Sequence, residues 1–404
     1  MAAAATLVIG PMSIDPALSS VRASPDTQVR PLRVMIAGGG TGGHLFPGVA
    51  LAEQVVASGG EVRFVGTKRG IEARVLPESG WALDTIEVTG IKGRGLRGLV
   101  AGLLRLPRAW LQSRAIIREF DPDVVVGVGG YASGPIVATA WLMRRPTAIL
   151  EQNSIPGITN RILGKLVRRV FATFPDRHGH FPARKLVLAG NPIRAELLER
   201  LAEARDLPTS SGAPAETGAV PSRPPRLFVF GGSQGAQAIN RAMLAAVGPL
   251  AERFPGLEIW HQTGEAQVEE VRQGYAEAGF SAPQVRVVSF IKDMSEPYAW
   301  CDLVLCRAGA TSLSELAAVG CPALLIPFPH ATDDHQTHNA RALVEAGAAE
   351  VVAERELGEG RMAAELGALL ADPEGLAAMH AAMLGAARPG AAADIYAGLE
   401  QLVG

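Results

Sequence analysis

The sequence has little of several features that mark common classes of protein. Its three cysteines, Cys301, Cys306 and Cys321, form no Cys-x-x-Cys pair, which argues against a disulfide framework and a thiolate zinc site and favours a reducing compartment. No uninterrupted apolar run reaches the roughly 18 residues that suggest a transmembrane helix, so no membrane span is predicted. The 38 basic and 40 acidic side chains give a net charge of −2, which excludes a whole-protein basic field for nucleic acid.

What the chain does have is length and apolar content. Its 404 residues are 48% hydrophobic, which predicts two or three domains with sizeable buried cores. The start of the chain differs from the rest, because the apolar stretch Ala2–Ile9 is short, lacks a preceding basic stretch and is soon followed by prolines. It fits a secretory signal poorly, and we expect residues 1–31 to be a disordered tail.

Short apolar runs alternate with stretches of helical spacing, which is typical of parallel βαβ units. The pattern begins with a strand at Leu32–Ala37 and restarts with one at Arg226–Phe230, after a segment rich in proline, serine, glycine and alanine. The other expected strands are Val62–Val65, Val124–Val128, Thr147–Leu150, Ile259–His261, Val285–Ser289, Leu303–Cys306 and Ala323–Ile326.

We therefore predict an α/β protein of two Rossmann-like domains that face a deep cleft. The expected boundaries are an N-terminal domain over 32–200, a linker or insertion over 201–225, a C-terminal domain over 226–387, and a last helix over about 388–404 that packs back on the first domain. Ligands of such sheets bind at the carboxyl ends of the strands, where this chain carries its glycines.

The first glycine loop, Gly38–His44, follows the first strand and opens a helix, which Pro47–Ala57 continues. Backbone N–H groups at such a helix start favour an anion such as a diphosphate. The glycines also fit the dinucleotide fingerprint, but the second expected strand ends in Gly66-Thr67 without the acidic residue that would hold the ribose of NAD. The sequence therefore disfavours a nicotinamide cofactor.

His44 stands at the end of this loop. A lone histidine is more often structural than catalytic, but a position where a helix start meets an anion site favours a functional role. The positive end of the helix is expected to lower the pKa of His44, which would leave the imidazole neutral and able to accept a proton near pH 7.

Two further glycine loops follow strands in the same way. The second glycine loop, Gly129–Pro135, is expected to share an anion site with the first, although a tight turn would need the same residues. The third glycine loop, Gly231–Gly235, lacks the Gly-Lys-Ser/Thr ending of a nucleotide-hydrolysing P-loop. Its Ser233 could donate its hydroxyl to a phosphate.

Two segments of the second half permit alternative interpretations. In Cys306–Glu315, Thr311 and Ser312 could cap a helix, with Glu315 completing a capping box; alternatively, the helix start binds a nucleotide diphosphate and Glu315 holds the ribose hydroxyls. The segment His330–Asn339 has three histidines and two aspartates, which suggests a metal at first sight but fits hydrogen bonding to a polyhydroxyl ligand at least as well.

The segment Ile91–Trp110 interleaves basic and apolar residues. Its leucines at helical spacing are typical of a core-facing helix, whereas its basic residues beside a tryptophan also suit an anionic membrane surface. The basic residues are Lys92, Arg94, Arg97, Arg105 and Arg108, and the patch could extend to Trp141, Arg144 and Arg145.

Taken together, several stretches resemble the MurG family, which transfers N-acetylglucosamine (GlcNAc) from UDP-GlcNAc to a membrane-bound muramyl-pentapeptide diphosphate lipid, the step from lipid I to lipid II of peptidoglycan synthesis. The resemblance runs from about Leu32 to the end of the chain, and a set of motifs in one order is far more specific than any single glycine loop. The stretches are GGGTGGHLFPGVALAE, GVGGYASGP, LEQNSIPGITNRIL, GNPIR, FGGSQGAQAIN, FIKDMSEPYAWCDLVLCRAGATSLSELAAVGCPALLIPFPHATDDHQTHNA and AGAA.

The resemblance implies the two-domain GT-B architecture, no cofactor, no tightly bound metal, and a peripheral place at the cytoplasmic face of the bacterial inner membrane. It also implies UDP-GlcNAc contacts at the residues that match the family's motifs. These are Thr41, Gly42, Gly43, Asn153, Arg194, Ser233, Ile291, Ala310, Thr311, Ser312, Leu313, Ser314, Glu315 and Gln336.

Together with the glycine loops, the resemblance suggests an inverting transfer without a covalent glycosyl adduct. His44 is expected to take the proton of the acceptor hydroxyl, and the acceptor's diphosphate is expected at Gly40, Gly130, Tyr131 and Ser133. Two alternatives remain: a UDP-GlcNAc 2-epimerase of the same architecture, and a non-enzymatic nucleotide-sugar binding protein. An epimerase would need no lipid-facing patch, and a binding protein would need no His44.

Overall fold

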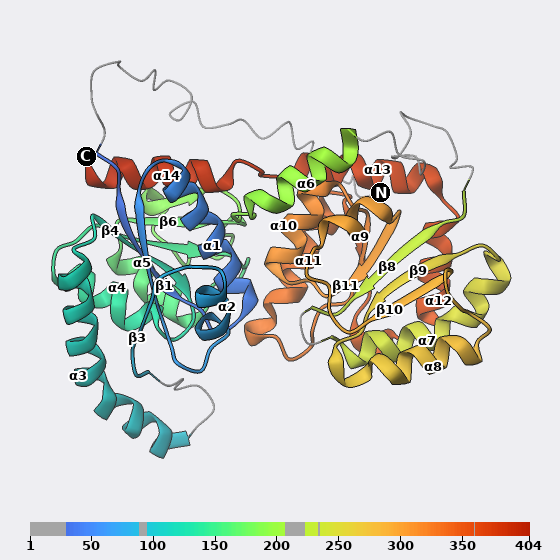
Figure 1. Ribbon diagram of the computed structural model, residues 1–404, viewed down its shortest axis with the longest axis horizontal. Helices are drawn as coiled ribbons and strands as arrows, with labels where there is room; N and C mark the ends of the chain where they lie inside the picture. The colour runs from blue at the N-terminus through green and yellow to red at the C-terminus, as the bar shows by residue number, and fades with distance from the viewer. Residues whose placement is uncertain (1–29, 89–94, 207–222, 233–234, 359) are drawn as a thin grey trace, which may run out of the picture. The chain divides into compact units, whose positions relative to one another are not determined.

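The chain forms two wholly parallel β-sheets, each flanked by helices (Figure 1). The structure is a computed structural model that describes residues 30–88, 95–206, 223–232, 235–358 and 360–404. Residues 32–404 form one compact unit, while the expected tail over 1–31 lies almost wholly outside the described residues.

The first sheet has seven strands in the order β3-β2-β1-β4-β5-β6-β7. Its strands are β1 (Arg33–Gly38), β2 (Glu61–Gly66), β3 (Leu83–Thr85), β4 (Val124–Gly129), β5 (Thr147–Glu151), β6 (Arg169–Ala172) and β7 (Leu186–Leu188). The central strands β4 and β5 are buried along their whole length, as their continuous apolar runs predict for a parallel sheet covered on both faces. The strand order reverses between β1 and β4, and this switch point is where doubly wound folds bind ligands.

The helices of the first half connect these strands. They are α1 (Gly42–Ala57), α2 (Glu72–Glu78), α3 (Gly95–Phe120), α4 (Ser133–Leu142) and α5 (Ile158–Leu166), with a short 3₁₀ turn η1 (Ala183–Lys185). Helix α1 begins five residues before the expected start at Pro47, since the last glycines of the first glycine loop already have helical backbone.

The second sheet has six strands in the order β10-β9-β8-β11-β12-β13. Its strands are β8 (Arg226–Phe230), β9 (Glu258–Gln262), β10 (Val285–Val288), β11 (Leu303–Cys306), β12 (Ala323–Leu325) and β13 (Ala349–Val351). The helices of this half are α6 (Ala195–Asp206), α7 (Gln237–Arg253), α8 (Val268–Glu277), α9 (Ser295–Trp300), α10 (Ala310–Val319), α11 (His335–Glu345), α12 (Arg361–Leu370), α13 (Pro373–Ala386) and α14 (Ala391–Val403), with the 3₁₀ turns η2 (Glu265–Gln267), η3 (Thr332–Asp334) and η4 (Glu354–Glu356).

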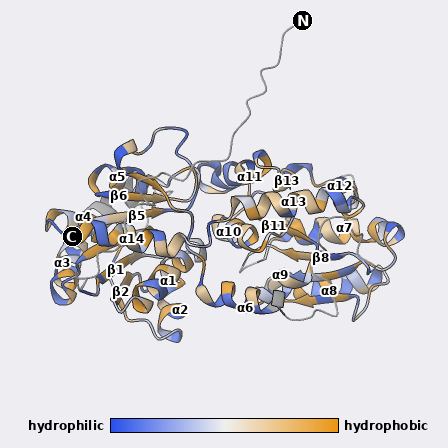
Figure 2. Cartoon of the chain, turned by 90° about the horizontal axis from the view of Figure 1, so that it is seen from above, coloured by the Kyte–Doolittle hydropathy of each residue, from blue (hydrophilic) through white to orange (hydrophobic). Residues whose placement is uncertain are grey.

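The two sheets have separate hydrophobic cores, and Figure 2 shows hydrophobic residues along the strands of both. Two helices pack against a different sheet from the one formed by the strands that precede them in the sequence. Leu197 and Leu201 of α6 join the core of the second sheet, and Ile395 and Leu399 of α14 join the core of the first sheet beside α1. In the part of the chain that the structure describes, no helix is long and apolar enough to cross a membrane.

Candidate functional site

The first and second glycine loops lie against each other at the switch point of the first sheet. The Gly39 N–H donates to the Gly129 carbonyl at 3.3 Å. A Cβ atom added to Gly130, whose φ is +80°, would lie 2.2 Å from the Gly39 carbonyl oxygen. Only glycine permits so close an approach of two backbones, and the two loops are therefore in direct contact.

The buried carboxyl group of Glu72, which no sequence motif indicated, is hydrogen-bonded to the first glycine loop. Glu72 has no exposed surface and accepts a hydrogen bond from the Gly40 N–H at 2.7 Å. It also accepts from the Thr67 N–H at 2.9 Å and from the Thr67 hydroxyl at 2.8 Å. The Gly40 N–H, which the sequence assigned to the acceptor's diphosphate, is therefore already used within the protein.

His44 lies in the first turn of α1, half-buried beside the second glycine loop. Its Nδ1 lies 3.1 Å from the Thr41 hydroxyl, and its ring packs so close to Gly129 that an added Cβ there would lie 2.6 Å from His44 Cδ2. Burial, together with a smaller contribution from the nearby His335, lowers the pKa of His44 to about 4. The expected direction of the pKa shift is found, but its main cause is burial rather than the helix end.

The N-terminus of α10 meets that of α1. The Thr311 hydroxyl donates to the Gly43 carbonyl at 3.4 Å, a carbonyl that a regular helix would pair with the N–H of Pro47. Proline has no N–H, which leaves this carbonyl available. Because the first N–H groups of a helix have no partner within it and carry partial positive charge, two such ends at one place favour an anion between them.

Helix α10 begins at Ala310, with Gly309 as its N-cap and no side-chain capping bond. The capping box of Ser312 and Glu315 is therefore wrong: the extended backbone ends at Gly309, three residues before Ser312, which puts Glu315 in the second turn. Glu315 is buried and accepts from the Tyr298 hydroxyl at 3.1 Å. Burial raises the pKa of Glu315, whereas the nearby Arg194 guanidinium and the Tyr298 hydroxyl lower it.

A buried amide joins the segment after β5 to α11. Asn339 has no exposed surface, and its Oδ1 accepts from the Ser154 N–H at 2.8 Å and the Ser154 hydroxyl at 2.9 Å. Its Nδ2 donates to Asn153 Oδ1 at 3.1 Å and to the Ala308 carbonyl at 3.4 Å. Asn153, expected to contact UDP-GlcNAc, is thus held by a residue 186 positions along the chain.

Glu151 anchors the same segment from the end of β5. Its Oε1 accepts from the Asn153 N–H at 3.0 Å and its Oε2 accepts from Asn160 Nδ2 at 2.9 Å. Burial raises the pKa of Glu151 to about 7, against the lowering effect of these hydrogen bonds. Glu151 thus holds the loop of Asn153 from the end of β5.

Further residues expected on the donor side include Arg194, Gln336 and Ile291. The Arg194 guanidinium lies 5.0 Å from the centre of the Phe46 ring, and its Nε is buried and has no hydrogen-bond partner among the described residues. Gln336 Oε1 accepts from the Phe328 N–H at 2.9 Å. Ile291 is half-buried against the core of the second sheet, and Ser233 lies outside the described residues.

Among the remaining residues expected on the acceptor side, one side chain is accessible. Tyr131 is 57% exposed, whereas the Ser133 side chain is fully buried beneath Gly127, where an added Cβ would lie 2.4 Å from its Oγ. A direct contact of the Ser133 hydroxyl with a ligand therefore does not fit this arrangement, because the hydroxyl faces the strand rather than the surface.

The histidine-rich segment is arranged by hydrogen bonds of its own. His335 Nδ1 lies 2.7 Å from the Thr332 carbonyl oxygen, and the Thr337 hydroxyl donates to Asp334 at 2.6 Å. Within the described ranges, no three His, Cys, Asp or Glu side chains are grouped so that they could hold a metal ion.

Exposed apolar residues gather on α3 and α4, which pack together. They are Trp110, Leu111, Trp141 and Leu142, each at least 39% exposed. The Arg114 guanidinium lies 5.5 Å from the centre of the Trp110 ring. Lys92 and Arg94 lie outside the described residues, and the side chains of residues 95–106, Arg97 and Arg105 included, are not described. Of the basic segment, only residues 107–110 are therefore described with their side chains.

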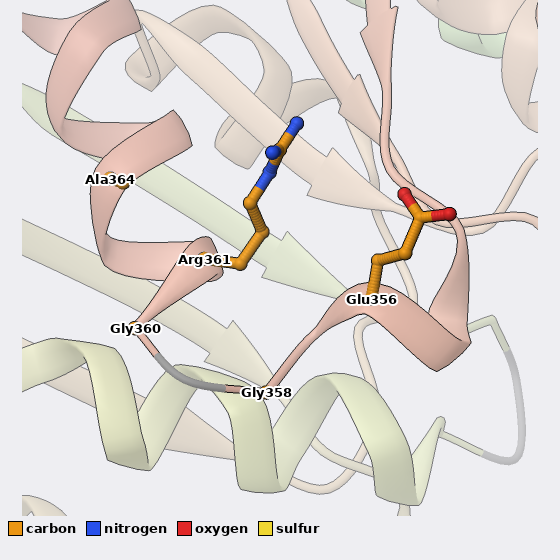
Figure 3. A pocket seen from close by; sticks show the side chains of 5 residues that line it. All are labelled: Glu356, Gly358, Gly360, Arg361 and Ala364. Carbon is orange, nitrogen blue, oxygen red and sulfur yellow. The ribbon is translucent and has the colours of Figure 1, made fainter.

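A shallow hollow of about 460 Å³ lies between η4 and α12, lined by Glu356, Gly358, Gly360, Arg361 and Ala364 (Figure 3). The Arg361 guanidinium in this lining forms an ion pair with Glu365 on the same helix, at 2.7 Å. None of the residues discussed above lines this hollow, and it is separate from the candidate site.

Comparison with known proteins gives one consistent result. Residues 34–172 match the glycosyltransferase family 28 N-terminal domain and residues 226–395 match the glycosyltransferase family 28 C-terminal domain. The chain is 51% identical over 345 residues to the UDP-N-acetylglucosamine--N-acetylmuramyl-(pentapeptide) pyrophosphoryl-undecaprenol N-acetylglucosamine transferase of Anaeromyxobacter dehalogenans, covering 85% of this chain and 86% of that protein. It is 49% identical over 368 residues to the protein of the same name from Myxococcus xanthus, covering 90% of this chain and 91% of that protein.

Solved structures agree in fold. The crystal structure of Acinetobacter baumannii MurG has a TM-score of 0.73 and 29% identity, covering 92% of this chain and 100% of that chain. The UDP-GlcNAc 2-epimerase of Neisseria meningitidis bound to UDP-GlcNAc has a TM-score of 0.61 and 14% identity, covering 91% of this chain and 99% of that chain. At that identity the epimerase shares the fold alone.

Proposed function

This chain belongs to the MurG family of glycosyltransferases, and from that premise we propose that it transfers GlcNAc from UDP-GlcNAc to the N-acetylmuramyl-(pentapeptide) pyrophosphoryl-undecaprenol lipid. It is an N-acetylglucosaminyltransferase of GT-B architecture, and the expectation of that fold and that enzyme class is confirmed. The reaction forms lipid II in peptidoglycan synthesis.

The observation that carries the proposal is the meeting of α1 and α10 at Thr311 and Gly43. This contact brings together the N-terminal ends of two helices, one from each sheet. His44 lies at the start of α1, and several of the expected donor residues belong to these two helix starts. An epimerase binds one nucleotide sugar, whereas a transferase must hold a donor and an acceptor together. Contributions from both sheets suit the second task.

On the donor side, we assign UDP-GlcNAc to the start of α10 and the loops around it. Glu315 would accept hydrogen bonds from the ribose hydroxyls, and Ile291 would lie beside the uracil. Arg194, whose Nε has no partner among the described residues, would contribute charge to the diphosphate together with the Ser233 hydroxyl. Charge-assisted bonds and a helix N-terminus stabilise the leaving UDP as negative charge develops on it.

Further donor contacts in this proposal use the backbone and polar side chains at the starts of α1, α10 and α11 and in the segment after β5. They are Thr41, Gly42, Gly43, Asn153, Ala310, Thr311, Ser312, Leu313, Ser314 and Gln336. The buried side chains of Ala310 and Leu313 leave these two residues with backbone contacts only.

On the acceptor side, His44 would accept the proton of the attacking hydroxyl. If Nδ1 donates its proton to the Thr41 hydroxyl, Nε2 is the basic nitrogen, and the low pKa of about 4 keeps the ring neutral at physiological pH. Direct attack on the anomeric carbon inverts its configuration, so the α-linked donor gives a β-linked product. Tyr131 and the backbone of Gly130 are the acceptor contacts that the structure leaves accessible.

We further propose that the apolar patch of α3 and α4 rests on an anionic membrane surface, at the cytoplasmic face of the inner membrane. Exposed tryptophans and leucines beside basic residues suit the boundary between headgroups and acyl chains. Docking by this patch would bring the second glycine loop, which directly precedes α4, toward the diphosphate of a lipid that stays in the bilayer.

One assay tests the function against its alternatives. The full chain is incubated with radiolabelled UDP-GlcNAc, with and without the muramyl-pentapeptide diphosphate lipid in detergent. Release of UDP that depends on the acceptor, together with a labelled disaccharide lipid, is the expected result. Formation of UDP-ManNAc or free ManNAc without acceptor would identify an epimerase, and binding without turnover would identify a nucleotide-sugar binding protein.

A further inference from the structure

We propose that Glu72 is a positioning residue of the transfer reaction, which fixes the first glycine loop and through it the catalytic base, His44. The inference rests on the proposed function for the role of His44, whereas the support of the loop by Glu72 is a property of the protein alone. Glu72 would not contact the reacting atoms: it holds the Gly40 N–H from within the protein, so its role is indirect.

The carboxylate is the buried end of a hydrogen-bond network. Both of its oxygens are used: Oε2 accepts from Gly40, and Oε1 accepts from the backbone and the hydroxyl of Thr67. A buried carboxylate is costly unless it is hydrogen-bonded, and charge-assisted bonds of this kind are stronger than neutral ones. Glu72 therefore ties the first glycine loop to the end of β2 at a fixed distance.

The chain makes room for this carboxylate with three glycines from separate segments. A Cβ added to Gly39 or Gly66 would lie 2.5 Å from the Glu72 side chain, and one added to Gly70 would lie 2.0 Å from its Oε2. None of these contacts could be relieved cheaply, because the carboxylate is held by its three donors. The first glycine loop, the end of β2 and the approach to α2 are thus shaped around one side chain.

The loop that Glu72 fixes leads directly to His44. Gly40 is followed by Thr41, which is the N-cap of α1 and whose hydroxyl contacts His44 Nδ1 at 3.1 Å. On its other side the loop is tied to Gly129, whose backbone also packs against the His44 ring. A shift of Gly40 would therefore move both the partner of Nδ1 and the helix start that carries the imidazole.

The same network changes what the first glycine loop offers to an anion. The N–H groups of Gly39 and Gly40 donate to the Gly129 carbonyl and to the Glu72 carboxyl group. The N–H groups of Thr41, Gly42 and Gly43, at the start of α1, are those that remain for a phosphate. Glu72 thereby directs the anion away from the glycine turn and toward the helix end beside His44.

The test uses two variants of Glu72 and two controls on the same helix. Glu72→Gln keeps the volume but replaces one acceptor oxygen with a donor NH₂, which must face Gly40 or Thr67; Glu72→Ala removes the support. Leu76→Ala, one turn along and 1% exposed, measures the effect of a damaged α2 without a change at the loop. Glu78→Gln, exposed on the same helix, removes a charge only.

Three quantities are measured on each variant: acceptor-dependent UDP release, the Kd of UDP-GlcNAc without acceptor, and hydrogen exchange of the segment 38–45 by mass spectrometry. We expect Glu72→Gln to lower kcat by about 10- to 100-fold, as a small misplacement of a catalytic group does, with a donor Kd within about twofold of the parent and exchange over 38–45 faster by about tenfold or more. The Leu76→Ala and Glu78→Gln variants should keep the parental exchange over 38–45 and the parental kcat.

The outcomes separate this proposal from the proposed function. If the parent shows no acceptor-dependent release, the proposed function fails, and the exchange of 38–45 in Glu72→Gln still decides whether Glu72 holds the loop. Parental exchange and parental kcat in Glu72→Gln would overturn the proposal. Equal losses of kcat in Glu72→Ala and Leu76→Ala, with no difference in loop exchange, would overturn it as well and reduce Glu72 to a stabilising core residue.

Discussion

Asn339→Ala removes a side chain that holds the Asn153 segment to α11 and Ala308. The substitution deletes four hydrogen bonds in a place without solvent access. It leaves Asn153 Oδ1, the Ala308 carbonyl, and the N–H and hydroxyl of Ser154 without this partner. Each buried polar group left unsatisfied costs about 1–3 kcal/mol.

Water can replace part of this loss, because Asn153 and Ser154 are only half-buried. We therefore expect the free energy of unfolding to fall by about 2–4 kcal/mol rather than by the full sum. If Asn153 contacts the donor as proposed, its displacement should also raise the Kd of UDP-GlcNAc by about tenfold, which corresponds to about 1.4 kcal/mol. Isothermal titration calorimetry without acceptor measures the Kd, and urea unfolding measures the stability.

A second variant separates the two halves of the amide. Asn339→Asp keeps an acceptor for Ser154 but cannot donate to Asn153, so it should weaken donor binding as much as Asn339→Ala does. Arg341→Ala, exposed on the same helix, is the matched control and should change neither quantity. A donor Kd within twofold of the parent in both Asn339 variants, in folded protein, would refute the link from Asn339 through Asn153 to the donor.

Four other predictions follow from the site. Glu315→Ala should raise the KM for UDP-GlcNAc by about tenfold or more through loss of charged hydrogen bonds worth about 1.5–3 kcal/mol; unchanged KM and kcat in steady-state kinetics would remove the ribose role. His44→Ala should lower kcat by about 10²- to 10⁴-fold with little change in the donor Kd, and near-normal kcat in the folded variant would exclude His44 as the general base. Because the pKa of His44 is about 4, the kcat/KM of the parent should fall only as the pH drops toward 4. The pKa of Glu151 is raised from 4.5 to about 7 in the folded chain, so the unfolded state loses its proton first as the pH rises. This residue should therefore lower the free energy of unfolding between about pH 4.5 and 7. In urea titrations Glu151→Gln should abolish that part of the pH dependence, and an unchanged pH dependence would contradict the assignment. Leu111→Glu combined with Leu142→Glu should abolish sedimentation with vesicles of anionic phospholipid while turnover of a short water-soluble acceptor analogue survives; parental vesicle binding would place the membrane contact elsewhere.

The sequence by itself determined the strand–loop–helix units at the centre of each sheet. A run such as Val124–Val128 is apolar throughout because its strand is covered on both faces, and the glycines after it mark the turn where strand gives way to helix. Both features are local, so β1, β4, β8 and β11 are predicted to within a residue or so. Short strands such as β3 and β7, with no fully buried residue, were missed because an edge strand lacks a continuous apolar run.

Only the tertiary structure decided which side chains meet. Glu72 reaches Gly40 across 32 positions and Asn339 reaches Ser154 across 185, and these distances close only because the strand order places the segments together. The start of α10 shows the same limit at short range: Ser312 and Glu315 have the spacing of a capping box, yet the backbone becomes helical at Ala310, where it also meets the Gly43 carbonyl that Pro47 leaves free. The spacing of residues in the sequence permits more than one local structure, and the packing of elements that are distant in the sequence determines which of them forms.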